Sequence, residues 1–215
     1  TYKVKETSGN IGGITYDGTE YTVTVSVVDN GDGTLTATPT YAVGKDSKNA
    51  IVFNNAYKAK DVETDLGATK KITGRDFQAN DSFTFTVTSK DGAPDFANKS
   101  VTVNPTSGDE VTVDFGKAKY TAVGTYEYTV KETKGSLGGV DYDETEYTVT
   151  VEVTDDLNGN LVAAKTYAVG ETTKGSIIFT NDYSAEGTLN LKAKKTLTGR
   201  TLKANEFSFQ LQDKD

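Results

Sequence analysis

Apolar and polar residues alternate through most of this 215-residue chain, in short segments separated by turn-forming residues. Strict alternation predicts strands, because successive side chains of a strand point to opposite faces. In the central part of the chain the expected strands cover residues 66–73, 83–88, 99–103, 110–115, 125–132, 146–154, 161–168 and 176–182. The breaks contain Gly, Asp and Asn, which favour hairpin turns. The pattern therefore predicts an all-β chain without helices.

The alternating pattern also repeats along the chain. Residues 1–57 reappear at 127–183 without a gap, at an offset of 126 residues, and 32 of the 57 positions are identical. A second match sets residues 70–75 against residues 195–200. A period of this length corresponds to a whole domain and is far too long for a solenoid or propeller unit. The chain is therefore expected to be a tandem array of domains.

This period divides the chain into three copies. We expect residues 1–57 to be the C-terminal part of one repeat, residues 58–183 a complete repeat and residues 184–215 the N-terminal part of a third. About seven or eight strands in a domain of this size predict a two-sheet, immunoglobulin-like β-sandwich. The two partial copies together fall well short of one repeat, so both ends of the chain are expected to lie within a domain.

The composition excludes several classes of function. Because the sequence has no His and no Cys, it cannot carry a Ser-His-Asp or Cys-His catalytic site, a zinc site with the usual ligands or a disulfide. With 31 acidic and 23 basic residues, its net charge of −8 argues against nucleic acid as a partner. No apolar run approaches the roughly 18–20 residues that span a bilayer, so no membrane segment is expected. We expect no cofactor and no bound metal.

Three polar residues of the complete repeat fall on otherwise apolar strand faces. The three faces consist of Leu66, Ala68, Lys70 and Ile72; of Tyr126, Tyr128, Val130 and Glu132; and of Ile177, Phe179, Asn181 and Tyr183. Lys70, Glu132 and Asn181 are each costly to bury alone, because a buried polar or charged group must be paired or neutralised. Meeting in one core would solve that problem for all three.

Three such residues in contact could react with one another. Burial favours the neutral amine of Lys70 and the protonated acid of Glu132. The amine could then attack the carboxamide of Asn181 while Glu132 moves the protons, leaving a Lys–Asn isopeptide bond and free ammonia. The alternative needs no reaction. A strand Lys is often solvated or guards an edge against aggregation, and a Glu or Asn at a strand end often makes a turn or a hydrogen bond.

Several separated motifs connect these residues to a known family. They are Lys70 followed by Lys-Ile-Thr-Gly-Arg, the run Gly124–Glu132, the pair Tyr142-Asp143 and the run Ile177–Asn181. In this order and spacing they resemble the isopeptide domains of streptococcal major pilins and Gram-positive surface adhesins. The resemblance implies that Lys70 is bonded to Asn181 and that Glu132 catalyses this self-reaction.

The same resemblance assigns positions in the partial copies. Glu6 and Asn55 would hold the catalyst and acceptor positions of the first copy, whose Lys would lie upstream of the sequence. Lys195 would hold the bonding position of the third copy, with its Glu and Asn downstream. Lys71 and Lys194 are the neighbours most easily confused with the bonding residues. They would point to the other face of a regular strand, although a bulge would reverse that assignment.

The resemblance implies a structural function. We expect a stalk or fibre repeat of a Gram-positive cell-surface adhesin or pilus, extracellular and anchored at the cell surface or wall. Its partners would be neighbouring repeats and, through other domains, host surface ligands. We do not expect an enzyme, since the only chemistry is a single turnover on the chain itself. A Tyr-Pro-Lys motif and a Leu-Pro-x-Thr-Gly signal, both expected of a polymerising pilin subunit, do not occur, which favours a tandem stalk.

Two other binding functions remain as alternatives. Residues 29–33 and 155–160 look superficially like the loops of a calcium-stiffened adhesin repeat, but both lack the bidentate Glu of an EF-hand loop, and hairpin turns account for them. Tyr41 and Tyr167 could stack against a sugar in a carbohydrate-binding sandwich. Packing on a strand face would account for both Tyr residues without a ligand.

Overall fold

The fold is described by a computed structural model that covers residues 1–214. Strands and turns but no helix occur in this range, so the all-β prediction is confirmed. The chain divides into two compact units, Thr1–Ser184 and Ala185–Asp215. Asp215, the last residue of the expected third copy, lies outside the described residues. Among residues 1–214 there is no helix long and apolar enough to cross a membrane.

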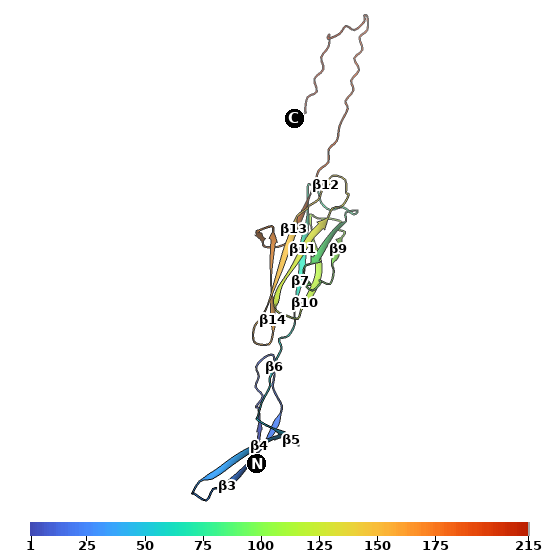
Figure 1. Ribbon diagram of the computed structural model, residues 1–215. Helices are drawn as coiled ribbons and strands as arrows, with labels where there is room; N and C mark the ends of the chain where they lie inside the picture. Colours follow the sequence, from blue (N-terminus) through green and yellow to red (C-terminus); the bar gives the residue numbers. More distant parts are fainter. Residues whose placement is uncertain (215) are drawn as a thin grey trace. The chain divides into compact units, whose positions relative to one another are not determined.

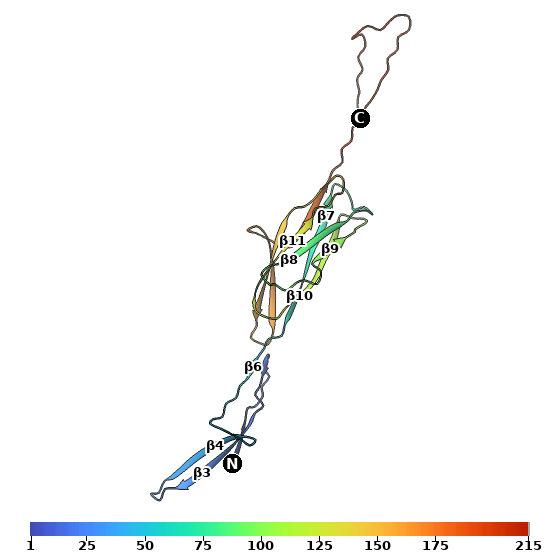
Figure 2. The same ribbon diagram turned by 45° about the vertical axis from the view of Figure 1, so that its right-hand side comes forward.

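Residues 62–183 fold into two facing β-sheets (Figures 1 and 2). The first sheet has the order β10-β7-β16-β12, with β7 (Val62–Thr73), β10 (Glu110–Tyr120), β12 (Val140–Asp141) and β16 (Ile178–Tyr183). The second has the order β15-β14-β13-β11-β8-β9, with β8 (Phe83–Ser89), β9 (Ser100–Val103), β11 (Gly124–Thr133), β13 (Glu146–Asp155), β14 (Leu161–Val169) and β15 (Thr172–Lys174). Side chains of both sheets meet in one apolar core, as expected for a β-sandwich.

The eight expected strands of this region are all present, with some shifted ends. β7 begins at Val62 instead of residue 66, and β10 continues to Tyr120 through an irregularity between Asp114 and Lys117. The sequence pattern missed β12 and β15, which are two and three residues long. Strands this short are not detectable, because they contain too few residues for alternation.

The first and last strands of the sandwich, β7 and β16, lie side by side and run parallel. In their register Phe179 lies opposite Lys70, and Asn181 lies opposite Ile72. Side chains on the same face of neighbouring strands are within reach of one another, including the diagonal pairs. This pairing therefore brings the face that carries Lys70 beside the face that carries Asn181.

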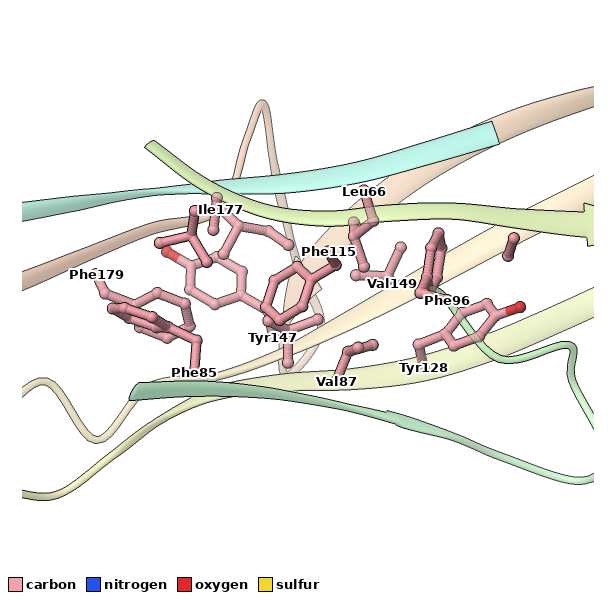
Figure 3. Close-up of a cluster of buried hydrophobic side chains, with 14 of the residues drawn as sticks. Leu66, Phe85, Val87, Phe96, Phe115, Tyr128, Tyr147, Val149, Ile177 and Phe179 are labelled. Atoms are coloured by element: carbon pink, nitrogen blue, oxygen red, sulfur yellow. The ribbon is translucent and has the colours of Figure 1, made fainter. Parts of the chain in front are cut away.

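Aromatic and β-branched side chains fill the space between the two sheets (Figure 3). The ring of Phe179 packs against Phe85 of β8 and Tyr147 of β13, with ring centroids 5.3 Å apart in both pairs. Phe96 packs edge-on against Tyr128 at 4.8 Å. Tilted and edge-on ring pairs are favourable arrangements, and the two pairs of Phe179 join side chains from both sheets.

Residues 1–57 form most of the strands that their counterparts form in the complete repeat, although the last strand is reduced to two residues. These strands are β1 (Tyr2–Lys5), β2 (Ile14–Thr15), β3 (Glu20–Asp29), β4 (Leu35–Val43), β5 (Asp46–Lys48) and β6 (Ala56–Tyr57). At the offset of 126 residues, β2 to β5 coincide with β12 to β15 end for end. Strands β1, β3, β4 and β5 make one sheet, and β2 pairs with β6.

Residues 185–214 form no strand in this structure. The pattern of Leu191 and Lys195 repeats that of β7 and predicts a strand, but Leu191 is 64% exposed. In the complete repeat β7 lies between β10 and β16, and residues 185–214 contain no counterpart of either strand. An isolated strand would leave its backbone groups unpaired, which accounts for the difference from the sequence prediction.

Candidate functional site

Lys70 is buried in the middle of the sandwich. It lies on β7, where the buried positions alternate with more exposed ones from Leu66 to Ile72, and the side chain of Lys70 has no solvent exposure. Its ammonium nitrogen lies 4.9 Å from the ring centroid of Phe83. A Lys in such apolar surroundings needs a polar partner, because burying a lone charge is very unfavourable.

That partner is Glu132, which reaches Lys70 from the opposite sheet. Glu132 lies on β11, on the face that also carries the buried side chains of Tyr128 and Val130. The Lys70 Nζ donates a hydrogen bond to Glu132 Oε2 at 2.9 Å, and both side chains are fully shielded from solvent. The contact spans the core, so it forms only when both sheets are in place.

Asn181 completes the trio from β16. Its side-chain amide donates to Glu132 Oε1 at 2.9 Å, so the two carboxyl oxygens of Glu132 contact Lys70 and Asn181 separately. Asn181 has no solvent exposure. The structure thus brings together the three residues that the alternating pattern singles out, with the carboxyl group between the amine and the amide.

The Asn181 carbonyl is held by a backbone group that the sequence pattern missed. The backbone N–H of Asp143 donates to Asn181 Oδ1 at 2.8 Å. The Asp143 carboxylate in turn accepts from the backbone N–H groups of Thr145 and Thr180 at 2.9 and 2.8 Å. A side-chain pattern cannot reveal a backbone donor, although the recurrence of Tyr-Asp-x-Thr at residues 16–19 and 142–145 was a usable signal.

Burial shifts the protonation of the pair in opposite directions. Desolvation lowers the pKa of Lys70, against the opposing effect of its hydrogen bond with Glu132. Desolvation raises the pKa of Glu132, again against the effect of the Lys70 contact. Both directions favour the uncharged forms, the amine and the carboxylic acid. This is the protonation that a nucleophilic Lys requires.

Lys71 lies on the other face of β7. Its ammonium group pairs with Glu110 at 2.7 Å, and its side chain is 43% exposed. The register of β7 with β10 is continuous from Gly67 to Lys71, and the irregularity in this pair falls further along, between Asp114 and Lys117. The regular strand therefore separates Lys71 from the buried trio.

The first copy contains two of the three positions in a similar arrangement. Asn55 donates through its side-chain amide to Glu6 Oε1 at 2.7 Å, and the backbone N–H of Asp17 donates to Asn55 Oδ1 at 2.8 Å. The second carboxyl oxygen, Glu6 Oε2, is buried and has no hydrogen-bond partner among the described residues. In the complete repeat the corresponding oxygen, Glu132 Oε2, accepts from Lys70. Glu6 Oε2 thus corresponds to the carboxyl oxygen that contacts Lys70 in the complete repeat.

Lys195 has no such environment. Its ammonium nitrogen lies 4.7 Å from the ring centroid of Phe207, and the segment around it is exposed and not a strand. Within the second unit the structure describes no Glu–Asn pair for this Lys.

The two acidic loops of the sequence form hairpin turns. Residues 29–35 connect β3 with β4, and residues 155–161 connect β13 with β14. Asp29 and Asp155 each accept hydrogen bonds from backbone N–H groups two residues further on, at 2.9 and 2.8 Å. These are ordinary Asx-type turn contacts. Tyr167, the aromatic residue considered for a carbohydrate site, packs partly buried against the apolar core.

Comparison with known proteins finds one matching family. The family described as FctA, Spy0128-like isopeptide containing domain, matches residues 1–58 and 66–184. No curated protein matches the chain.

Two solved structures illustrate the similarity to known folds. The major pilin from Streptococcus pyogenes is 23% identical with a TM-score of 0.44, covering 55% of this chain and 50% of the pilin chain. The major pilin protein T-13 from Streptococcus pyogenes is 20% identical with a TM-score of 0.41, covering 58% of this chain and 54% of its own. The chain spans about half the length of the solved structures that it matches.

Proposed function

Because this chain belongs to the family of Spy0128-like isopeptide containing domains, we propose that it is a structural segment of a Gram-positive pilus or surface fibre, locked by a Lys70–Asn181 isopeptide bond. One observation carries this proposal. The buried carboxyl group of Glu132 accepts hydrogen bonds from the Lys70 amine and the Asn181 amide, both at 2.9 Å. The arrangement contains a nucleophile, an electrophile and a proton carrier that water does not reach.

The reaction begins at the neutral amine of Lys70. Its Nζ lone pair attacks Cγ of Asn181, and the carbonyl electrons move onto Oδ1. Glu132 starts protonated, donates its proton to the departing Nδ2 and takes one proton from Nζ, so its own protonation is unchanged at the end. The Cγ–Nδ2 bond breaks, ammonia leaves, and an amide joins Nζ to Cγ. One Lys and one Asn are consumed, so the site turns over once and acts on no external substrate.

The backbone around Asn181 assists the same step. Negative charge develops on Oδ1 in the tetrahedral intermediate, and the Asp143 N–H already points at this oxygen from 2.8 Å. A fixed donor at the position of developing charge stabilises the transition state, as in an oxyanion hole. The Asp143 carboxylate is itself fixed by the Thr145 and Thr180 N–H groups, which keeps this donor in place.

The bond would have both a thermodynamic and a mechanical effect. By analogy with a disulfide, closing the loop from Lys70 to Asn181 contributes about 4–5 kcal/mol in the chain-entropy account. Because the bond joins the first strand of the sandwich to the last, pulling force passes from β7 to β16 through covalent bonds. The residues between them then cannot be drawn out, and no reductant cleaves the bond. These properties suit an extracellular fibre whose partners are neighbouring repeats and other pilin subunits.

The repeat organisation belongs to the same proposal. Residues 58–183 form one complete isopeptide domain, residues 1–57 the C-terminal part of the preceding copy and residues 184–215 the opening of the next. In this arrangement Glu6 and Asn55 serve a Lys from the preceding segment, and Lys195 serves a Glu and an Asn that follow. The internal sequence repeat and the equivalent placement of Glu6 and Glu132 support it.

Intact mass spectrometry of the purified chain tests the bond. We expect a mass lower than that of the sequence by one ammonia, together with a cross-linked peptide that contains Lys70 and Asn181. Glu132→Ala should restore the full mass, because the proton carrier is gone. Glu6→Ala is the matched control and should leave the ammonia deficit unchanged. Full mass in the unsubstituted chain would refute the proposal.

A further inference from the structure

The first copy contacts the complete repeat through a glycine-rich turn and a tyrosine. The hydroxyl of Tyr57 donates to Asp155 Oδ1 at 2.6 Å and accepts from the backbone N–H of Gly159 at 3.3 Å. The neighbouring turn carries Gly12 and Gly13, which lie against the backbone of Asn158 and Gly159. We call Gly12, Gly13 and Tyr57 the docking surface of the first copy and residues 155–160 the docking hairpin of the complete repeat.

This contact accounts for glycine at both positions of the turn. A Cβ atom at Gly12 would overlap the carbonyl oxygen of Asn158, and one at Gly13 would lie 2.9 Å from the Cα of Gly159. Gly13 also has a φ of 77°, a left-handed conformation that favours glycine. Gly12 has no such conformational reason, so the close approach of the neighbouring repeat is what excludes a side chain there.

The complete repeat carries a second docking surface with the same residues. Gly138, Gly139 and Tyr183 correspond to Gly12, Gly13 and Tyr57 at the offset of 126 residues. The local geometry is equivalent, since Ser184 N–H donates to Gly139 O at 2.9 Å as Lys58 N–H does to Gly13 O at 2.9 Å. Gly139 has a φ of 77°, equal to that of Gly13.

This second surface is formed but unused by the described residues. A Cβ atom at Gly138 would meet nothing within 4 Å, although a Cβ at the equivalent Gly12 would overlap a neighbour. Among residues 1–214 the Tyr183 hydroxyl makes no hydrogen bond, while its ring is held by the guanidinium of Arg75 at 4.7 Å. Arg75 is fixed in turn by a two-pronged contact with Asp81, at 2.6 and 2.9 Å.

The docking hairpin also has a counterpart elsewhere in the chain. The hairpin of the first copy has the same closing bond, because Asn30 N–H donates to Thr34 O at 3.0 Å as Asp156 N–H does to Asn160 O. Gly33 corresponds to Gly159 and has a similar φ, 87° against 91°. The first copy and the complete repeat therefore each carry both the hairpin and the docking surface.

We propose that Gly138, Gly139 and Tyr183 form the docking surface for the 155–160-type hairpin of a following copy of this repeat. The occupant is a further copy because the equivalent surface of the first copy already holds the hairpin of the complete repeat. The result is a head-to-tail joint at each repeat boundary, in which a Tyr hydroxyl bridges to an Asp and a Gly of the next domain. This proposal rests on the tandem stalk role but not on the isopeptide bond.

The test uses a chain extended by a second copy of residues 58–183, inserted after Tyr183. The sequence contains no Cys, so Lys174→Cys in both complete copies provides the only two sites for spin labels. Lys174 is exposed on β15. We expect double electron–electron resonance to give one narrow distance distribution. Gly138→Val in the first complete copy should broaden it to about twice its width or more, because unconstrained neighbouring domains move relative to each other.

Matched variants separate docking from folding. Gly175→Val, at another glycine with open space around it, should leave the distribution narrow. In the original 215-residue chain Gly138→Val should leave the melting temperature unchanged, because it does not disturb folding. In the extended chain Tyr183→Phe should broaden the distance distribution, because it removes only the hydroxyl that makes the joint. A broad distribution in the unsubstituted extended chain, or one that Gly138→Val does not alter, would overturn the joint. The mass deficit in ammonia reports the isopeptide bonds separately, so failure of either proposal is recognised by itself.

Discussion

Residues 1–57 and 127–183 share most of their sequence and most of their strands, yet their side chains differ greatly in burial. Val27 is 56% exposed and its counterpart Val153 is 2% exposed, while Leu35 is 67% exposed and Leu161 is 7% exposed. In residues 62–183 the sheet that contains β7, β10 and β16 packs against the sheet that contains β11, β13 and β14, whereas no second sheet of this kind packs against β1, β3, β4 and β5 within the described chain. Most strands of residues 1–57 thus form without the rest of the repeat, but burial and the full length of the last strand depend on the whole repeat.

The polar residues show the same contrast. The turn that places a backbone N–H on the Asn carbonyl forms in both copies, with the Asp17 and Asp143 contacts each at 2.8 Å. Asn181 is fully buried, whereas Asn55 is exposed. Local sequence therefore orients the amide, but only the complete sandwich removes it from water and adds the Lys amine. The four predictions that follow test this distinction with matched substitutions.

Substitution of the acceptor Asn should give the largest difference. Asn181→Ala removes the carbon that Lys70 would attack, so the chain should keep its full mass and lose about 4–5 kcal/mol of unfolding free energy. Asn55→Ala removes no Lys–Asn isopeptide bond from this chain, so it should leave both the ammonia deficit in mass and the melting temperature unchanged. Calorimetry and intact mass check both variants. Equal destabilisation by the two substitutions would mean that the copies do not differ in this way.

A buried aromatic ring should give the next largest difference. Phe179 has no solvent exposure and lies between Phe85 and Tyr147, so Phe179→Ala should cost about 3–5 kcal/mol through lost burial and the cavity left behind. Phe53 is the same repeat position, but it is only partly buried. Phe53→Ala should cost less than about 1 kcal/mol in urea unfolding. A cost at Phe53 similar to that at Phe179 would indicate a packed core in the first copy.

The sequence alone located the fold and the trio but not every residue around it. Alternation was sufficient for Lys70, because the strand is regular there and burial follows the period of two. Alternation could not show that Glu132 would lie between Lys70 and Asn181, because that position depends on how the two sheets pack face to face. The role of the Asp143 backbone N–H was missed although Tyr142-Asp143 was among the motifs, because a motif of side chains does not show a backbone donor. The strands β12 and β15 were missed because they are too short to show alternation. Lys195 shows the limit, since the β7 pattern forms no strand without its partners.

The third prediction compares two equivalent charge pairs, one in the complete repeat and one in the third copy. Arg75 and Asp81 form a two-pronged contact, and Asp81 is 3% exposed, so Asp81→Ala should cost about 2–3 kcal/mol by leaving the Arg unpaired. In the third copy Arg200 and Glu206 make the equivalent contact in an exposed segment. Glu206→Ala should leave the melting temperature unchanged. A comparable loss at Glu206 would show that residues 185–214 contribute a folded core.

The smallest effect is the acid dependence of the Arg75–Asp81 pair. The hydrogen bond between Asp81 and Arg75 lowers the pKa of the Asp81 carboxyl group. The ionised carboxylate therefore contributes stability to the folded state, and this contribution is complete above the unfolded pKa of about 3.9. That contribution should be lost as the pH falls through the lowered folded pKa. Urea unfolding at a series of pH values measures how much the free energy of unfolding of the unsubstituted chain exceeds that of Asp81→Asn. This advantage should shrink below about pH 4. An advantage that stays constant down to pH 2 would contradict this assignment.

The parallel pairing of β7 with β16 also fixes when the proposed cross-link can form. β7 can pair with β10 earlier, but it meets β16, and Lys70 meets Asn181, only after the last strand of the repeat has been made. Pairing of residues so distant in sequence closes late in folding. In the proposed fibre each repeat would therefore stay free of its cross-link until its last strand has been made and has paired with its first.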